Sequence, residues 1–172
     1  MTWTNSKVFG VMLYNSISNQ TNNIVLGTDA FKVALYGTNS TPDNTVSTAN
    51  SSYASGQWIS SSNGTNEVWS TQTASAGWPQ TGLALASPTF TTASSGSVPT
   101  AAYTATFNGN SLSSTTSTAI IAAAYGCLVY DTTQSGNPGV CYNYFGGSQS
   151  VTNGTFTIVW NASGIAQFQS PA

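Results

Sequence analysis

The strict alternation of apolar and polar residues in TFTIVW (155–160) is the feature that most constrains the fold. Phe156, Ile158 and Trp160 take every second position, and threonine fills two of the alternate positions. Successive side chains of a β-strand point to opposite sides of a sheet, so this pattern predicts a strand with one buried face. We therefore interpret Trp160 as a core residue. The preceding Asn153-Gly154 pair predicts a tight turn.

Five further segments have the composition of strands and are separated by clusters of Gly, Pro, Ser and Asn. In FKVALYGT (31–38), apolar residues fill every second position, which predicts a strand with one buried face. The run 117–131 is rich in Ile, Leu, Val and Tyr, which favours a strand buried on both faces over a helix. The other predicted strands are 66–70, 82–90 and 101–107. Many short strands between turn signals predict an all-β fold, either a β-sandwich or a barrel-like arrangement of antiparallel sheets.

Two other segments depart from the strand pattern. Residues 5–17 place apolar side chains at i, i+4 spacing, which predicts one short N-terminal helix with Asn5 or Ser6 as its cap. Residues 39–65 contain few large apolar side chains and predict a long surface loop around a weak segment at 53–59. The chain has 172 residues, of which 40% are hydrophobic, and shows no internal repeat. It is therefore expected to form a single domain, 1–172.

Charged residues are scarce, which excludes several classes of partner. The chain contains two Lys, four Asp or Glu, and no His. Nucleic-acid binding relies on several Lys or Arg contacts with phosphates, and an anionic membrane surface attracts clusters of basic residues. No apolar run approaches the roughly 18 residues that span a bilayer. We therefore expect no nucleic-acid partner and no membrane partner. The opening MTWTNSKVFGVMLYNSIS lacks a signal-peptide pattern, so use without Sec export is expected.

The same composition argues against catalysis. General acid–base chemistry usually relies on His or on neighbouring carboxylates, and a Ser-His-Asp triad is impossible without His. The acids Asp29, Asp43, Glu67 and Asp131 occupy turn-like or strand-start positions, where we expect turn caps or solvated polar groups. Two Cys and four scattered acids do not make a metal-ligand set. We therefore expect a non-enzyme with no catalytic, cofactor-binding or metal-binding residues.

The two cysteines flank a strong turn signal. Cys127 and Cys141 lie on either side of DTTQSGNPG (131–139), and a hairpin centred near Gln134 or Ser135 would place them about opposite each other. Two alternatives follow: buried free thiols, or a disulfide that forms after release into an oxidising medium.

Aromatic residues raise the question of sugar stacking. Trp58 and Trp78 lie in segments rich in Gly, Ser and Pro, so they are candidates for exposed contact. The alternative is that such residues fill the core of an all-β domain.

A near-neutral composition suits a subunit that is built into an assembly. Few titratable groups predict a weak dependence of stability on pH, and few ion pairs predict a weak dependence on salt. Weak self-repulsion favours association. Ser, Thr and Asn, which make up 68 of the 172 residues, must supply the polar surface. Composition alone thus favours a structural or interaction protein.

Three segments resemble small structural proteins of tailed bacteriophages. These are TDAFKVALYGTNSTPD (28–43), NEVWSTQTASAGWPQTGLAL (66–85) and, with the most specific likeness, CLVYDTTQSGNPGVCYNYFGGSQSVTNGTFTIVWNASGI (127–165). Proteins of this group often have an Arg before the strand that contains Tyr130 and an acid before the Phe-Gly pair. Here the uncharged AAAYGC (122–127) and Tyr144 stand in those places, so ion pairs of the group do not carry over.

The resemblance implies a virion structural protein without catalytic residues, assembled in the host cytoplasm. A capsid (head) decoration or cement protein that binds the major capsid protein is the favoured interpretation, and self-association as a homo-oligomer is compatible with it. A tail or fibre component that contacts the host surface is the alternative within this group. A carbohydrate-binding module is the alternative of another class. The loops at 39–65 and 91–100 are the candidates for partner contact.

Overall fold

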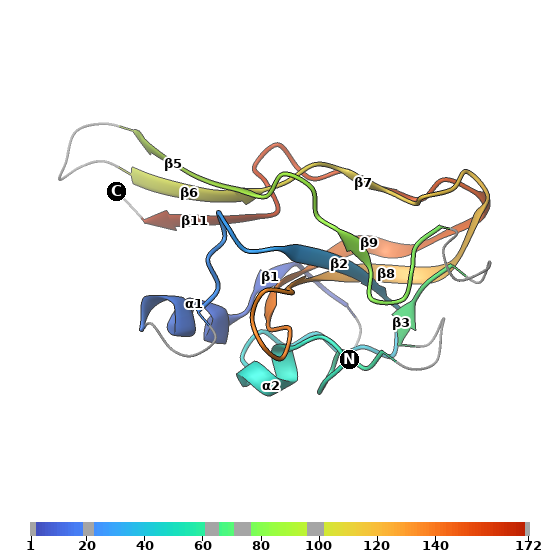
Figure 1. Ribbon diagram of the computed structural model, residues 1–172, viewed down its shortest axis with the longest axis horizontal. Coiled ribbons are helices and arrows are strands. Elements are labelled where there is room, and N and C mark those ends of the chain that lie inside the picture. Colours follow the sequence, from blue (N-terminus) through green and yellow to red (C-terminus); the bar gives the residue numbers. More distant parts are fainter. Residues whose placement is uncertain (1–2, 19–22, 61–65, 71–76, 96–101, 171–172) are drawn as a thin grey trace.

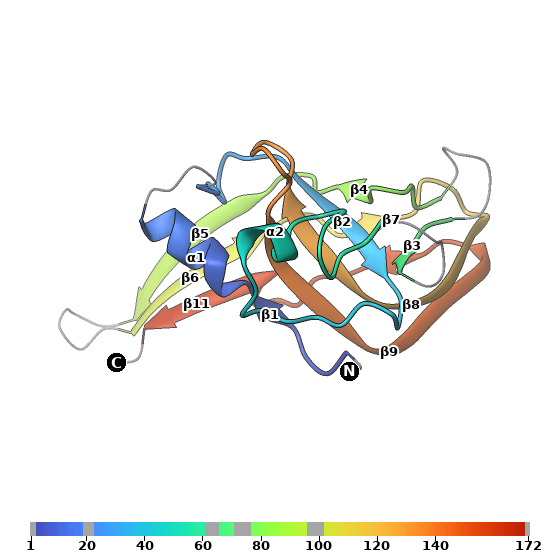
Figure 2. The ribbon, with the colours of Figure 1, turned by 90° about the horizontal axis from the view of Figure 1, so that it is seen from below.

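The computed structural model describes residues 3–18, 23–60, 66–70, 77–95 and 102–170. Strands account for 43% of the described residues and helices for 8%. The sheets are antiparallel and the fold is sandwich-like, so the predicted all-β class is confirmed (Figures 1 and 2).

Eleven strands and two helices lie in the described part of the chain. In order they are β1 (Lys7–Val8), α1 (Gly10–Ile17), β2 (Phe31–Tyr36), α2 (Thr48–Ser51), β3 (Glu67–Val68), β4 (Leu83–Ala84), β5 (Thr89–Ser95), β6 (Ala102–Asn108), β7 (Leu112–Ser113), β8 (Ala119–Asp131), β9 (Gly139–Gly154), β10 (Thr157–Ile158) and β11 (Ala166–Ser170).

The strands form two layers. One is a six-stranded sheet in the order β1-β9-β8-β2-β3, with β4 also paired to β2. The other contains the two-stranded sheet β10-β7 and the three-stranded sheet β11-β6-β5. In Figure 1 these smaller sheets lie above the six-stranded sheet, and α2 lies below it. Both faces of the six-stranded sheet are therefore covered.

The predicted strand segments all contain strands, although their extents differ. Segment 82–90 holds two, β4 and the start of β5. Ser87 between them has a positive φ of 51°, and Pro88 lacks the N–H that a ladder requires. The run 117–131 forms β8, whose last five residues are all buried, as expected for a strand covered on both faces.

Strand β2 is buried on both faces rather than on one. The Phe31 ring packs edge-on against Phe107 of β6, with ring centroids 5.1 Å apart. The Tyr36 ring, from the opposite face of β2, packs against Trp58 at 4.9 Å. Only Lys32 is partly exposed along this strand. The prediction of a single buried face was wrong because residues outside the strands cover the second face.

The expected surface loop at 39–65 is exposed or half-buried over most of its described part, but the prediction was wrong around 51–58. The segment contains α2, and it places the side chains of Tyr53 and Trp58 in the core. Trp58 has no exposed surface and contacts the rings of Trp3, Phe9 and Tyr142. Burial of this large ring draws the Ser- and Gly-rich segment onto the sheet. Residues 61–65 lie outside the described residues.

The predicted roles of three tryptophans change as a result. Trp58 and Trp78, the candidates for exposed contact, are both fully buried. Trp78 donates from Nε1 to the Val33 carbonyl at 3.2 Å and packs edge-on against Phe156. Trp160, interpreted as core, is only half-buried and donates from Nε1 to the Asn110 carbonyl. The two side chains that precede it in the alternation, Phe156 and Ile158, are buried as predicted.

The N-terminal helix begins later than predicted. The short strand β1 comes first and pairs with β9, so α1 starts at Gly10, with Phe9 in the cap position. Ser6, one of the two predicted caps, instead accepts a hydrogen bond from the Tyr144 backbone N–H through Oγ at 2.9 Å. The buried Phe9 ring anchors this change from strand to helix.

Both cysteines are free and buried. The hairpin β8-β9 forms as predicted, but its register pairs Cys141 with Val129 and Cys127 with Asn143. The two thiols thus lie on the same face of the sheet, two positions apart, rather than opposite each other. Burial raises the pKa of both thiols, that of Cys141 to about 12. The structure agrees with the free-thiol alternative.

Candidate functional site

A bulge in β9 creates the larger of two surface features with functional potential. Tyr144 of β9 pairs with Gly126 of β8, and Gln149 pairs with Ala124. The chain therefore advances five residues along β9 while it advances two along β8. The additional residues leave the ladder and bend the strand. Gly146 and Gly147 make this bend with φ values of 79° and 156°, which residues with a Cβ rarely adopt.

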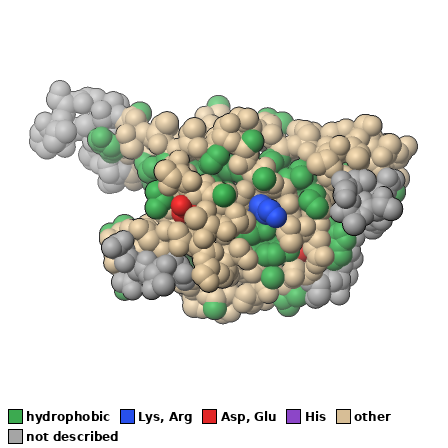
Figure 3. Space-filling view, viewed as in Figure 1, with side chains coloured by type: hydrophobic (Ala, Val, Ile, Leu, Met, Phe, Trp, Pro, Cys, Tyr) green, Lys and Arg blue, Asp and Glu red, His purple; other side chains and the backbone are tan. Residues whose placement is uncertain are grey.

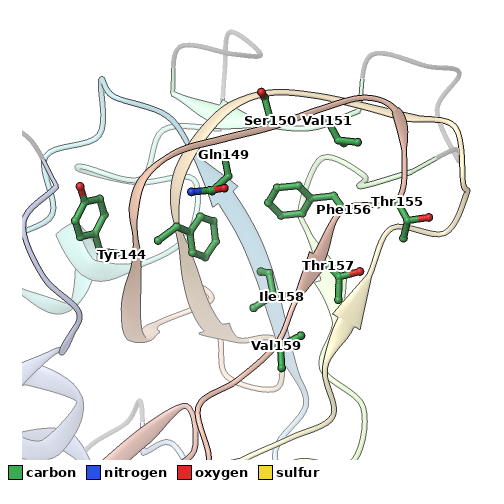
Figure 4. A pocket seen from close by; sticks show the side chains of 10 residues that line it. Tyr144, Gln149, Ser150, Val151, Thr155, Phe156, Thr157, Ile158 and Val159 are labelled. Carbon is green, nitrogen blue, oxygen red and sulfur yellow. The ribbon is translucent and has the colours of Figure 1, made fainter.

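The bend opens a cleft between β9 and the segment 155–159 (Figure 4). Its volume is about 590 Å³. The side chain of Gln149 on β9 and those of Phe156 and Ile158 in the segment 155–159 point toward its middle. Phe156 and Ile158 are buried and form the floor. The Phe145 ring lies 6.3 Å from that of Phe156 and continues this floor toward β9.

Uncharged polar groups line the rest of the cleft. Gln149, Ser150 and Thr155 are exposed. The Thr157 hydroxyl is held 2.9 Å from the Ser113 hydroxyl of β7. No Lys, Asp or Glu lies among the lining residues. The cleft therefore combines an apolar floor with amide and hydroxyl groups, an arrangement suited to a neutral ligand.

A second feature is an apolar groove between α1, the segment 23–26 and the three-stranded sheet. Its volume is about 370 Å³, and its lining is mainly apolar. Leu13, Val25 and Phe90 border it and are 37%, 45% and 42% exposed. The Phe90 ring packs edge-on against Phe168 of β11 at 6.1 Å.

One more exposed apolar side chain of α1 lies beside Leu13 at the border of this groove. Ile17 lies one turn beyond Leu13 on the helix and is 85% exposed, whereas Tyr14, which is 64% exposed, points away from the side of the helix that lines the groove. We call Leu13, Ile17, Val25 and Phe90 the apolar face. Charged side chains are few on the side of the molecule that Figure 3 presents.

Three of the four acids are buried more deeply than the sequence suggested. Glu67 has no exposed surface, contrary to the expected turn cap or solvated position. Its carboxylate accepts hydrogen bonds from the Tyr53 hydroxyl at 2.9 Å and from the Thr81 backbone N–H at 2.8 Å. Burial raises the pKa of Glu67 to about 7, because loss of solvent disfavours the charged form more than these bonds favour it.

Asp131 caps the hairpin turn as predicted but is fully buried while doing so. Its Oδ1 accepts hydrogen bonds from the backbone N–H groups of Thr133 and Gln134 at 2.6 and 3.2 Å. Burial, with a smaller contribution from the neighbouring Asp29, raises the pKa of Asp131 to about 6. Asp29 is itself buried and accepts a bond from the Val25 N–H.

Asp43 is the acid that matches its predicted role. Its Oδ1 accepts hydrogen bonds from the backbone N–H and the hydroxyl of Thr45 at 2.8 and 2.7 Å, which lowers the pKa of Asp43. Within the described ranges, no three His, Cys, Asp or Glu side chains come together in a way that could hold a metal ion. None of the helices that the structure describes has the length and hydrophobicity to cross a bilayer.

Comparison of the chain with protein-family models, curated protein sequences and solved structures finds no match.

The predicted contact loops do not coincide with these two features. The described part of loop 39–65 lines neither feature and contributes Tyr53 and Trp58 to the core, residues 91–95 belong to β5, and 96–100 lie outside the described residues. The sequence contained a signal for the cleft, since two glycines in a row inside a strand indicate a bulge. It contained a weaker one for the apolar face, because Leu13 and Ile17 share an i, i+4 stripe of the predicted helix.

Proposed function

We propose that this protein is a structural subunit of a tailed-bacteriophage virion, most specifically a capsid decoration or cement protein that binds the major capsid protein and has no catalytic role. The resemblance of segments 28–43 and 127–165 to small phage structural proteins supports this assignment. These segments form the centre of the six-stranded sheet and the strands that follow it. The resemblance therefore covers the scaffold of the fold.

The apolar face carries the proposal. Exposed large apolar side chains are ordinary when scattered, but a contiguous group beside a groove marks a protein-interaction surface. Here four such side chains lie on α1, the segment 23–26 and β5. A chain with a net charge of −2 has few ion pairs to offer a partner, so burial of this face is the main source of binding energy available.

The location in the particle distinguishes the decoration subunit from a tail or fibre component. A decoration protein occurs in numbers that match the capsid lattice, and a tail part occurs in a few copies. Electron microscopy of purified particles, with labelled subunits counted per particle, separates these two outcomes. The carbohydrate-module alternative loses its original basis, because Trp58 and Trp78 are buried.

A direct test measures binding of the purified chain to capsids of the parent phage that lack it. Ile17→Asp and Phe90→Ser place polar groups in the apolar face, and each is expected to weaken co-sedimentation by about tenfold or more. Ile59→Asp is the matched control, because Ile59 is also exposed, at 47%, and lies outside the apolar face.

The control is expected to bind like the unmodified chain. Circular dichroism and thermal unfolding of each variant show whether the fold is intact. Equal capsid binding by the unmodified chain and by folded Ile17→Asp and Phe90→Ser variants would contradict the role of the apolar face. Absence of the chain from purified particles would contradict the virion assignment itself.

A further inference from the structure

We propose that the cleft between β9 and the segment 155–159 is a binding site for a neutral carbohydrate. This inference goes beyond the proposed structural role and does not depend on it, because the cleft and the apolar face share no residue. Three properties of the cleft lead to it: its lack of charge, its pairing of an apolar floor with polar groups, and its interrupted strand edge.

The lack of charge restricts the ligand to neutral molecules. No basic side chain lines the cleft, so phosphate, sulfate and carboxylate groups find no partner there. No acidic side chain lines it either, so a cationic ligand gains nothing from entering. A ligand that shed its hydration shell without such partners would lose binding energy.

The pairing of groups matches the two-sided chemistry of a sugar ring. A pyranose presents C–H groups on its faces and hydroxyls around its edge. The rings of Phe145 and Phe156 and the side chain of Ile158 supply apolar contact for a face. The Gln149 amide, which points toward the same space, offers both a donor and an acceptor for the hydroxyls. Ser150 and Thr155 add hydroxyls at the rim.

The interrupted edge of β9 disfavours an extended peptide as the occupant. Addition of a strand requires a regular row of unpaired N–H and C=O groups. Between Tyr144 and Gln149, both of which line the cleft, the β9 backbone leaves its ladder, so that row is broken along the cleft. A lipid chain is disfavoured because more of the accessible wall is polar than apolar. A sugar needs neither a regular edge nor a continuous apolar wall.

The experiment screens the full chain against a panel of neutral polysaccharides and oligosaccharides: dextran, galactomannan, maltohexaose, cellohexaose and uncharged O-antigen from Gram-negative bacteria. Heparin serves as a polyanionic comparison. Biolayer interferometry gives affinity, and saturation-transfer NMR reports which sugar protons contact aromatic rings. We expect at least one neutral member to bind with saturation, and heparin not to bind.

Matched variants locate the binding to the cleft. Gln149→Ala and Phe145→Ala are each expected to weaken binding by about tenfold, the effect of losing one good hydrogen bond or ring contact. Gln167→Ala and Phe90→Ala remove the same side-chain types outside the cleft and are expected to leave affinity unchanged. Gln149 is exposed, so its variant is expected to fold even if Phe145→Ala does not.

The proposal is overturned if no neutral member binds, if heparin binds more tightly than the neutral members, or if Gln149→Ala binds as well as Gln167→Ala. The capsid-binding assay is read in parallel with the same proteins. Loss of sugar binding with normal capsid binding places the two activities on separate surfaces. Failure of capsid binding alone leaves the carbohydrate inference standing.

Discussion

The six-stranded and the three-stranded sheets use their side chains in opposite ways. In the former, Val33, Leu35 and Leu128 have no exposed surface, and aromatic rings pack beneath the sheet around Trp58. In the latter, Phe90 and Tyr103 remain 42% and 50% exposed. The outward face of the three-stranded sheet carries rows such as Thr91, Thr106 and Gln167, paired side by side.

This difference shows that stabilisation of the fold and exposure of apolar and hydroxyl groups are assigned to different sheets. Buried apolar and aromatic area is concentrated in the six-stranded sheet, which therefore accounts for most of the folding free energy. The three-stranded sheet and α1 instead leave apolar and hydroxyl groups exposed. Substitutions in the two regions should consequently differ in their effect on stability, and the following tests measure that difference.

The largest effect is expected at the centre of the aromatic cluster. Trp58→Ala removes a fully buried ring that contacts four other rings, Trp3, Phe9, Tyr36 and Tyr142. It should lower the free energy of unfolding by about 3–5 kcal/mol, measured by urea denaturation. Phe90→Ala in the three-stranded sheet should cost about 1 kcal/mol, because its ring is already partly in water. Equal costs would show that the two regions contribute alike to stability.

The next effect concerns pH and the buried carboxyl of Glu67. Composition predicted little dependence of stability on pH, but burial raises the pKa of Glu67 from 4.5 to about 7. The folded state then binds this proton more tightly than the unfolded state, so stability is highest below pH 4.5 and falls as pH rises to about 7. The expected loss is about 3 kcal/mol, by the conversion of pKa shift to free energy.

Glu67→Gln keeps the size of the side chain and removes its titration. Urea denaturation at several pH values should give a flatter profile for this variant between pH 4.5 and 7. A smaller fall should remain, with the same sign, from Asp131, whose pKa is raised to about 6. Identical profiles for the variant and the unmodified chain would show that Glu67 is not the group responsible.

A glycine comparison gives the third test. A Cβ on Gly126 in β8 would lie 2.2 Å from a ring carbon of Trp3 and 2.4 Å from the Asn143 carbonyl oxygen. Gly126→Ala should therefore cost about 1–3 kcal/mol through overpacking. A Cβ on Gly27, beside the three-stranded sheet, would meet nothing closer than Phe90 Cβ at 3.8 Å.

Gly27→Ala is consequently expected to change the free energy of unfolding by no more than about 0.5 kcal/mol. Both variants replace glycine by alanine, so both restrict the unfolded backbone in the same way. The difference between their free energies of unfolding therefore reports the cost of packing the added Cβ. Thermal unfolding of both, followed by circular dichroism, is sufficient. Equal destabilisation would mean that Trp3 moves aside without loss.

The sequence predicted the strands far better than it predicted which non-strand residues are buried. Alternation in 31–38 and 155–160 identified β2 and β10 because period-two patterns are local. Burial of Trp58 and Glu67 depends instead on residues distant in the chain, such as Tyr36 and Thr81, which a local pattern does not contain. The register of the hairpin, and so the offset of Cys127 from Cys141, depends on bulges that the turn signal alone did not reveal.

The smallest effect is expected on the outward face of the three-stranded sheet. Thr91 is exposed and pairs with Thr106, which in turn pairs with Gln167. Thr91→Ala should change the free energy of unfolding by about 0.5 kcal/mol or less, because a surface threonine contributes mainly β-propensity. Urea denaturation measures this, and Val33→Ala in the centre of β2, expected to cost at least about 2 kcal/mol, is the reference. A loss at Thr91 as large as that at Val33 would mean that the hydroxyl rows stabilise the fold, and the division between a stabilising sheet and a contact sheet would no longer hold.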